Sequence, residues 1–599
     1  MFSVNVLRYA LYLLSPLSLT LTSYLYLYPI FHLCAFPAPP SSGSALSNTL
    51  RDHVAPSKHS HPAVAPFRLL ALGDPQLEGD TSLPDPDTES FPNLSKFWED
   101  ALLLNGVEHN FLQRIRHSLH DLVDFYFDDL PALLLGYRKR IDLVGNDLYL
   151  AHIYRTLHWW TRPTHVTVLG DLIGSQWIDD QEFTSRSSRF WNNVFKHAER
   201  VSDELTAERP AEDKSTLVLG EDPELWRWRI MNVAGNHDIG YAGDLDEARL
   251  ARFERIYGRA NYELRFQLST PSQDNLSALS SGDPSREIPE LRIVLLNDMN
   301  LDAPASSKEL QDATYSFLNR VISQSHDVRR SAHFTLLLTH IPLYKAAGIC
   351  VDPPFFDYFD DVDNNGVKEQ NHLSSHASKG IFEGLYGMSG NPAVDGKGFG
   401  RPGLMLVGHD HEGCDVWHYI NQSQPEDERI WQASPIRKAR QESLMTQPSV
   451  PGLREITVRS MMGEFGGNAG LLSLWFDADA WEWQYEFDTC ALGQQHIWWA
   501  VHVIDLITVG FVIAFCCNLL LQKFGIRVER GQVRNEKPDA TKQIVGGSAD
   551  MNGHGLLTPP GSGKKSLKKK RSRSKLKGAE AAEATGRLSL EKIFERPQS

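Results

Sequence analysis

The chain of 599 residues is long enough for two or three average domains, or for one elaborated α/β domain with tails. Its net charge of −15 argues against a general nucleic-acid-binding protein, and six scattered cysteines without a C-x-x-C pair exclude a disulfide-rich scaffold. The charge is unevenly distributed. Residues 523–599 carry 18 Lys and Arg against 8 Asp and Glu, a surplus of +10 that leaves −25 for the rest of the chain.

The first predicted element is an uncleaved transmembrane helix over residues 9–36. No charged side chain follows Arg8 for 42 residues, and this apolar run exceeds the roughly 20 residues that a bilayer core requires. Cleavage of the run as a signal peptide near residues 35–38 is the alternative. Residues 1–8 precede the helix, and residues 37–66, rich in Pro, Ser and Ala, are predicted to form a linker to the next domain.

Five short apolar runs each end in Asp, Asn or His. The predicted strands cover residues 67–72, 166–169, 229–234, 334–338 and 404–407. The polar residues that follow them are Asp74, Gln76, Asp171, Asn236, His237, Asp238, His340, His409 and His411. Ligands bind outside the carboxyl ends of the strands in an open α/β sheet, so these side chains are predicted to converge. One such motif alone is more typical of a surface turn.

A long insertion, residues 78–163, separates the first two motifs. Apolar residues at helical spacing in 93–127 and 146–160 predict amphipathic helices that cover the sheet. The remaining predicted elements are a helix over 181–209, a buried strand over 291–296, a solvated loop over 348–403 and closing strands over 471–486.

The ordered motifs resemble those of the calcineurin-like metallophosphoesterases: Asp-x-His, Gly-Asp, Gly-Asn-His-Asp/Glu, His and Gly-His-x-His. The match runs from residue 67 to residue 412 and departs from the family at Gln76, where the family usually has histidine. The resemblance implies an α/β fold, a sandwich of mixed β-sheets flanked by helices. This domain is expected to span residues 67–495, between two transmembrane helices.

The resemblance also implies a centre of two divalent metal ions, which activate a water and clamp the phosphoryl oxygens. Its expected ligands are Asp171 as the bridge, Asp74, Gln76 and His411 for the first ion, and Asn236, His340 and His409 for the second. An amide oxygen at Gln76 is a weaker donor than imidazole, so mixed oxygen and nitrogen ligation favours manganese over zinc. The alternative is a first site too weak to fill, in a one-metal or non-catalytic protein.

His237 would then be free to protonate the leaving alkoxide or to hold a phosphoryl oxygen, with Asp238 setting its tautomer. Three cations that follow the last motif, Arg437, Lys438 and Arg440, are candidates to bind the substrate phosphate, because guanidinium groups match phosphate oxygens. A solvated basic turn is the equal alternative for these three residues.

Cys350 and Cys414 follow the fourth and fifth motifs, so their loops are expected to be neighbours. Either one disulfide in an oxidising compartment or two free thiols is consistent with this arrangement.

A second transmembrane helix is predicted over residues 497–521, interrupted by Asp505, to which we assign no chemical role. Lys and Arg flank the outer ends of both predicted spans and are missing from the inner flanks. The positive-inside rule therefore places both termini in the cytosol and the motif-bearing body in the lumen. Residues 522–599 are predicted to be a disordered, basic cytosolic tail.

Within this superfamily, the topology and motifs resemble the fungal and animal branch that removes ethanolamine phosphate from a mannose of the GPI-anchor glycan. That branch implies GPI-anchored proteins as substrates, support of their ER-to-Golgi transport, association with a cargo receptor, and residence in the endoplasmic reticulum membrane or cycling to the Golgi. The alternatives are a luminal phosphatase or nucleotide phosphodiesterase of other specificity, and a non-catalytic cargo-sorting protein with the same fold.

Overall fold

The structure, a computed structural model, describes residues 4–40, 43–54, 64–79, 91–101, 111–208, 217–268, 287–350, 355–360 and 365–523. The expected cytosolic tail lies outside these ranges, except for its first two residues, which continue a helix.

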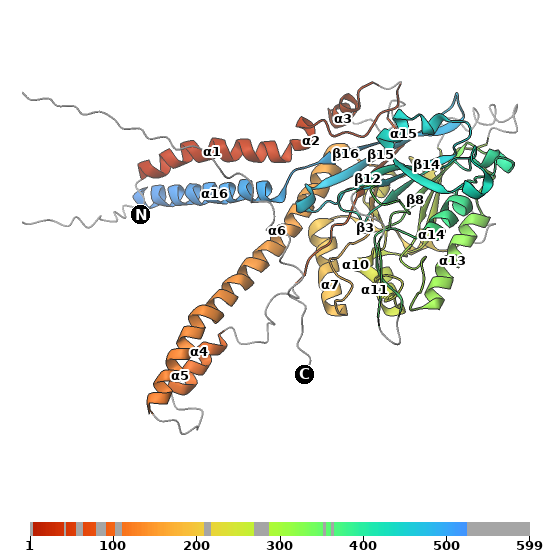
Figure 1. Ribbon diagram of the computed structural model, residues 1–599. Coiled ribbons are helices and arrows are strands. Elements are labelled where there is room, and N and C mark those ends of the chain that lie inside the picture. The colour runs from red at the N-terminus through yellow and green to blue at the C-terminus, as the bar shows by residue number, and fades with distance from the viewer. Residues whose placement is uncertain are drawn as a thin grey trace, which may run out of the picture. The chain divides into compact units, whose positions relative to one another are not determined.

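The strands are β1 Phe67–Leu72, β2 His165–Val168, β3 Glu199–Arg200, β4 Leu217–Leu219, β5 Arg229–Asn232, β6 Tyr262–Leu268, β7 Glu290–Leu295, β8 His333–Leu338, β9 Phe356–Tyr358, β10 Val367–Gln370, β11 Gly403–Val407, β12 Cys414–Ile420, β13 Trp431–Pro435, β14 Gly452–Thr457, β15 Asn468–Asp477 and β16 Glu482–Ala491. Two mixed sheets form the centre of the fold (Figure 1). One has the order β16-β15-β1-β2-β5-β3, the other β13-β12-β14-β11-β8-β7-β6-β4, and β9 pairs with β10 separately. The structure confirms the five strands that precede the motifs, the buried strand over 291–296 and the closing strands over 471–486.

The two large sheets pack face to face. Side chains alternate along each strand, so Phe67 and Leu69 of β1 lie in the same apolar cluster as Phe334 and Leu336 of β8. The neighbouring side chain Leu70 belongs instead to a second cluster that includes the helices. The expected sandwich of mixed sheets flanked by helices fits this arrangement.

The longer helices are α1 Val4–Tyr26, α3 Ala45–Val54, α4 Pro92–Ala101, α5 Phe111–Asp124, α6 Leu130–Thr161, α7 Asp180–Arg189, α11 Glu247–Tyr257, α13 Lys308–Ser323 and α16 Gln495–Lys523. Shorter ones are α2 Tyr28–Phe31, α8 Asp203–Thr206, α9 Pro223–Trp226, α10 Asn236–Ile239, α14 Ser375–Gly380, α15 Ile436–Gln441 and the π-helical turns η1 Phe125–Asp129, η2 Phe190–Val194 and η3 Ile381–Leu385. Helix α11 packs on the first sheet, where the Tyr257 carbonyl accepts from the Asn232 amide. Helix α13 packs on the second, where the Val321 carbonyl accepts from Arg292.

Three expectations from the sequence are wrong in part. Helix α7 continues only through η2 and stops before His197, whose φ of 77° is incompatible with a right-handed helix. Ile115 and Leu119 of α5 are exposed, so this part of the insertion does not cover a sheet. The predicted loop over 348–403 contains β9, β10 and α14.

Helices α1 and α16 are long and apolar enough to cross a bilayer, and they lie side by side (Figure 1). The Ser18 and Thr22 hydroxyls of α1 donate to the two carboxylate oxygens of Asp505 on α16, at 2.6 and 2.7 Å. A disulfide between Cys34 and Cys490 joins the chain that follows α2 to the end of β16, shortly before α16. The bridge fastens the chain after α2 to the sandwich, and the Asp505 contacts hold α1 against α16.

Candidate metal centre

Tight turns at the carboxyl ends of the strands bring the predicted donors together. Asp74, Gln76, Asp171 and His409 all have positive φ, between 39° and 73°. Such backbone conformations are uncommon for residues other than glycine and cluster at functional sites.

The glycines of the motifs leave room for this convergence. A Cβ atom on Gly170 would lie 2.1 Å from Nδ1 of His340, and one on Gly235 would lie 2.2 Å from the backbone nitrogen of Asp171. Any larger residue at either position would push the motif loops apart, which explains why Gly-Asp and Gly-Asn-His-Asp begin with glycine.

Two backbone carbonyls determine which histidine nitrogens face the centre. Nδ1 of His340 lies 2.7 Å from the Leu169 carbonyl, and Nε2 of His409 lies 2.9 Å from the Gln370 carbonyl. Carbonyls only accept, so these nitrogens carry the protons and the opposite nitrogens present lone pairs. Burial lowers the pKa of both histidines, that of His409 to about 3, so both rings are neutral.

Four acceptor atoms therefore meet in the first of two donor clusters. Nε2 of His340 and Nδ1 of His409 each lie 3.0 Å from Oδ1 of Asn236 and 3.3 Å from one another. Nε2 of His340 is also 3.3 Å from Oδ1 of Asp171. Lone pairs at these distances repel unless a cation lies among them, so the donor set fits a divalent metal ion.

The second cluster shares Asp171 with the first. Asp74, Asp171 and His411 offer donor atoms that all lie within 4.8 Å of one another. Oδ2 of Asp74 is fully buried and has no hydrogen-bond partner among the described residues. Because Asp171 belongs to both clusters, its carboxylate is positioned to bridge two ions, as the sequence predicts.

The two buried carboxylates have opposite pKa shifts. Burial and the Asp171 charge raise the pKa of Asp74 well above its usual value. Burial also raises the pKa of Asp171, but the charge interaction with His237 and the hydrogen bond from the His237 backbone nitrogen act against burial, and the pKa falls to about 2. Adjacent cations would remove the repulsion that Asp74 experiences, so both carboxylates would be ionised when the ions are bound.

His237 lines the cleft without belonging to either donor cluster. Its backbone nitrogen donates to Oδ1 of Asp171 at 2.9 Å, and its side-chain Nε2 lies 3.7 Å from Oδ2 of Asp171. This position is suited to a proton donor beside the metal centre.

Asp238 has a different environment from the one expected. Its buried oxygens accept from the backbone nitrogens of Gly235, Leu172 and Ile173, at 2.9 to 3.1 Å. The Asp238 carboxylate therefore shapes the turn that presents Asn236 and His237, instead of setting the tautomer of the His237 ring.

The centre opens into a cleft of about 340 Å³. Its lining includes residues that no motif indicated, and those are Tyr241, Glu369, Asn371, His372, Asp410, Glu412 and Phe465. Glu369, Asn371 and His372 come from the segment around β10, which was predicted to be a solvated loop. This segment is positioned by the pairing of β10 with β9 and by a hydrogen bond from the Leu373 nitrogen to the Pro342 carbonyl, contacts that have no local sequence signal.

The three cations expected to bind phosphate lie elsewhere. Arg437, Lys438 and Arg440 belong to α15, where all three are exposed and Lys438 approaches Glu442 at 3.9 Å. Among the described residues that line the cleft, no Lys or Arg is found. These three residues therefore form an exposed basic segment outside the cleft, which is the alternative that the sequence left open.

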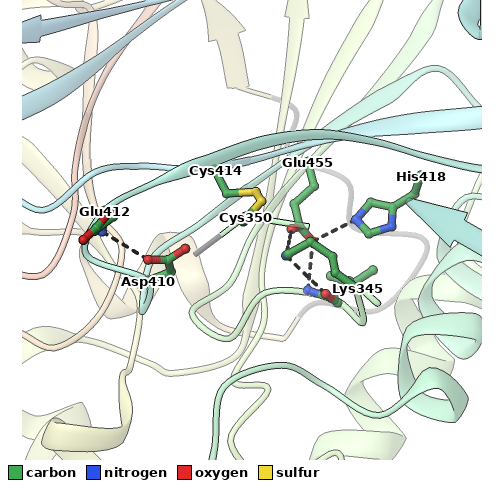
Figure 2. Close-up of a disulfide and its surroundings, with 8 residues drawn as sticks. Lys345, Cys350, Asp410, Glu412, Cys414, His418 and Glu455 are labelled. Carbon is green, nitrogen blue, oxygen red and sulfur yellow. Dashed lines mark hydrogen bonds and ion pairs between the residues drawn. A yellow bond between two sulfur atoms is a disulfide. The ribbon is translucent and has the colours of Figure 1, made fainter. Parts of the chain in front are cut away.

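A disulfide and a buried ion pair hold the loops beside the centre (Figure 2). Cys350, in the loop that follows β8, is bonded to Cys414, the third residue after the donor His411. Figure 2 shows Lys345 and His418 both directed at Glu455, whose oxygens lie 2.6 Å from the lysine and 3.3 Å from the histidine. Burial raises the pKa of Glu455, but the charges of Lys345 and His418 lower it by more, so the carboxylate is anionic.

Gln76 does face the centre. Its side-chain nitrogen lies 2.9 Å from Oδ2 of Asp171 and 3.0 Å from Nε2 of His411. The amide thus donates to the Asp171 carboxylate, whereas the sequence led us to expect its oxygen as a metal ligand.

The substitution Gln76→His tests which role matters. An imidazole at residue 76 would add a metal donor where the amide nitrogen now offers none, so the variant should reach half-maximal activity at a lower manganese concentration, with an unchanged or reduced maximal rate. Manganese titration of both proteins measures this. Identical half-saturating concentrations would mean that residue 76 acts only as a hydrogen-bond donor to Asp171.

No protein-family model matches the chain. It is 31% identical over 414 residues to Protein TED1 of Saccharomyces cerevisiae, an alignment that covers 62% of this chain and 77% of the yeast protein. An uncharacterized protein of Schizosaccharomyces pombe is 28% identical, with 61% and 79% covered. Metallophosphoesterase 1 of Rattus norvegicus is 22% identical, with 46% of this chain and 57% of the rat protein covered.

These similarities agree with the geometry of the site. Its two donor clusters suit the metal-dependent cleavage of phosphoesters that the name metallophosphoesterase describes. The alignment also covers most of TED1. The chain therefore belongs to the metallophosphoesterase family that includes TED1 and metallophosphoesterase 1, and it is a hydrolase of phosphoester bonds.

Proposed function

We propose that this hydrolase removes ethanolamine phosphate from a mannose of the GPI-anchor glycan, within the early secretory pathway. The observation that carries the proposal is the charge of the cleft. Glu369, Asp410 and Glu412 line it beside the metal centre, and no Lys or Arg does so among the described residues.

Carboxylates around a phosphoesterase centre favour a substrate that also carries a positive charge. The metal ions attract the phosphate, and the ammonium group of ethanolamine would lie against the acidic rim. A nucleotide or another polyanion would instead be repelled by the same carboxylates. The cleft therefore supports a zwitterionic phosphodiester over the nucleotide alternative.

The side chains divide the chemistry between them. When bound, two divalent ions, which we propose to be manganese, neutralise charge on the phosphoryl group and lower the pKa of a water molecule. Asp171, His340 and His409 would bind the ions. Backbone carbonyls orient the two imidazole rings so that one nitrogen of each faces the centre. His237 lines the cleft with its Nε2 3.7 Å from Oδ2 of Asp171, and it donates a proton to the departing mannose oxygen.

Membrane anchoring would keep the enzyme near its lipid-linked substrate. Helices α1 and α16 have the required length and apolar composition, and we propose that both span the endoplasmic reticulum membrane with the sandwich in the lumen. Two disulfides, Cys34–Cys490 and Cys350–Cys414, support an oxidising compartment. Association with a cargo receptor and cycling to the Golgi remain part of this proposal.

Neutralising the acidic rim tests the assignment of the substrate. For the full-length protein in detergent, Glu369→Gln and Glu412→Gln should each raise KM for an ethanolamine phosphodiester by up to about fivefold, the worth of one exposed ion pair. Neither should affect a phosphodiester whose alcohol carries no ammonium group. Glu383→Gln, which changes an exposed glutamate of η3 away from the cleft, is the matched control.

Analysis of cells completes this test. GPI glycans from cells that lack the protein should retain one additional ethanolamine phosphate, visible by mass spectrometry. Unchanged glycans, together with faster turnover of nucleotides than of ethanolamine phosphodiesters, would contradict the proposal and support the nucleotide alternative.

A further inference from the structure

Helix α6, in the insertion between the first two motifs, carries an apolar face that no described residue covers. Five large apolar side chains on it are 48% to 59% exposed, and those are Leu134, Tyr137, Ile141, Val144 and Leu148. Their spacing alternates between three and four residues, so they form one stripe along the helix. We call these five residues the α6 stripe. An apolar stripe that faces outward, away from any core, marks an interaction surface.

The face that carries the α6 stripe also contacts the two apolar helices α1 and α16. Gly145 and His152 each lie four residues after a member of the stripe, so they continue the same face. A Cβ atom on Gly145 would lie 1.7 Å from the ring of Trp499 on α16, so the indole packs directly on the α6 backbone. The ring of His152 lies 4.8 Å from that of Tyr26, the last residue of α1.

Polar contacts fix α6 to the chain that enters α16. The Tyr149 hydroxyl donates to the Gly493 carbonyl, and the Gln495 amide donates to Oδ1 of Asn146. Trp498 lies beside Tyr149, with ring centroids 6.2 Å apart. Tryptophan and tyrosine are typical of the level at which a membrane-spanning segment meets water. The α6 stripe therefore starts at that level and continues away from the ends of the two helices.

The charged residues around the stripe indicate what covers it. Arg138, Lys139, Arg140 and Asp142 all lie off the stripe, and Lys139 pairs with Glu78 at 2.6 Å. An apolar face flanked by cations is the pattern of helices that lie in a membrane interface, where the cations stay near lipid phosphates. Lipid would also surround the adjoining ends of α1 and α16, so a bilayer meets the stripe without any further partner.

We propose that the α6 stripe inserts into the luminal leaflet of the membrane that α1 and α16 span, so that α6 lies along the membrane surface. The inference rests on the proposed membrane topology, and it adds a third point of attachment that no motif indicated. It does not depend on the identity of the substrate.

This attachment would hold the metal centre close to the bilayer. The 3₁₀ turn η7 Gly463–Phe465 links the two regions. Phe465 lines the cleft, 4.9 Å from the ring of the donor His411. At the other end of the turn, a Cβ atom on Gly463 would lie 2.4 Å from the side chain of Gln495, the first residue of α16. A substrate that keeps its lipid in the membrane would therefore meet the cleft at the membrane surface.

Nitroxide labels in the full-length protein test the insertion. The two free cysteines, Cys516 and Cys517, are first replaced by serine. The protein is then labelled at Ile141→Cys and reconstituted in phosphatidylcholine vesicles. The label should be more accessible to oxygen than to a water-soluble nickel chelate, as a side chain in lipid is. The matched control is Asp142→Cys, the next exposed residue and off the stripe, where the order should be reversed.

A further label, at Val509→Cys in the middle of α16, reports the membrane-spanning helix itself. Water access at residue 141 with lipid at residue 509 would overturn the inference and leave the topology standing. Water access at both would overturn both. Shielding of residue 141 from oxygen and nickel alike would indicate a protein contact, such as a second copy of this chain, and would overturn the inference as well.

Two neighbouring leucines supply a test by activity. Leu134 and Leu135 are 59% and 60% exposed, but they lie about 100° apart around the helix. Leu134→Asp should lower turnover of a lipid-linked ethanolamine phosphodiester in vesicles severalfold and leave a soluble phosphodiester unaffected, because a carboxylate resists burial in the leaflet. Leu135→Asp should change neither. Equal losses in both variants would overturn the inference, whereas an unaltered protein inactive on this lipid would contradict only the proposed substrate, since the labels do not depend on it.

Discussion

Replacing Asp171 with asparagine is expected to remove bound metal and catalytic turnover together. Asp171 belongs to both donor clusters, so an amide at this position would lower the affinity for both ions at once. Metal ions contribute several kcal/mol of transition-state stabilisation, and each 1.36 kcal/mol corresponds to a factor of ten, so turnover should fall by roughly 10³-fold. Metal content by mass spectrometry and turnover of a generic phosphodiester are measured on the same preparation.

His409→Ala should behave similarly, because it removes a direct donor whose orientation the Gln370 carbonyl determines. Asp415→Asn is the control, since this aspartate pairs with Arg454 on β14 and belongs to neither cluster. If Asp171→Asn retained a full complement of metal with reduced turnover, Asp171 would act on the nucleophile and not as a bridging ligand.

The substitution His237→Ala is expected to separate metal binding from catalysis. His237 lies in neither donor cluster, and its Nε2 stands 3.7 Å from Asp171 at the cleft wall. The variant should keep its metal and lose about 10²–10⁴-fold in turnover of an alkyl phosphodiester, the usual contribution of general acid catalysis. For a nitrophenyl ester, whose leaving group needs no proton, the loss should be far smaller.

A second imidazole in the cleft supplies the matched control. Burial, and then the charge of Lys345, lower the pKa of His372 to about 4, so this ring holds no extra proton to donate at neutral pH. His372→Ala should therefore show no dependence on the leaving group. Loss of metal from His237→Ala equal to that from Asp171→Asn would assign His237 as a ligand instead.

The sequence alone was sufficient for the central strands and for most of the candidate centre. Each strand is a short apolar run, and each run ends in a glycine or threonine followed by a donor. The alternation that buries Phe67 and Leu69 on one face and Leu70 on the other is local, with a period of two residues. Parallel strands align their carboxyl ends, so the order of the motifs was enough to predict that the turns of Asp171 and Asn236 meet, after β2 and β5, and likewise those of His340 and His409, after β8 and β11. Asp171 meets His340 because the two sheets pack face to face.

Roles that depend on single hydrogen bonds could not be predicted in this way. Asp238 accepts from three backbone nitrogens, and Gln76 directs its nitrogen at Asp171. Neighbours in the sequence do not indicate such partners, because the turns at positive φ decide where each side chain points.

Only the tertiary structure decided the remaining features of the protein, because they arise between segments far apart in the chain. The pairing of Cys34 with Cys490 spans 456 residues. Glu369 reaches the cleft from a segment that resembles a solvated loop, while Arg437 follows the last motif closely and yet lies on an exposed helix outside it. Contact across such separations depends on how the sheets and loops pack, and local apolar periodicity carries no information about that packing.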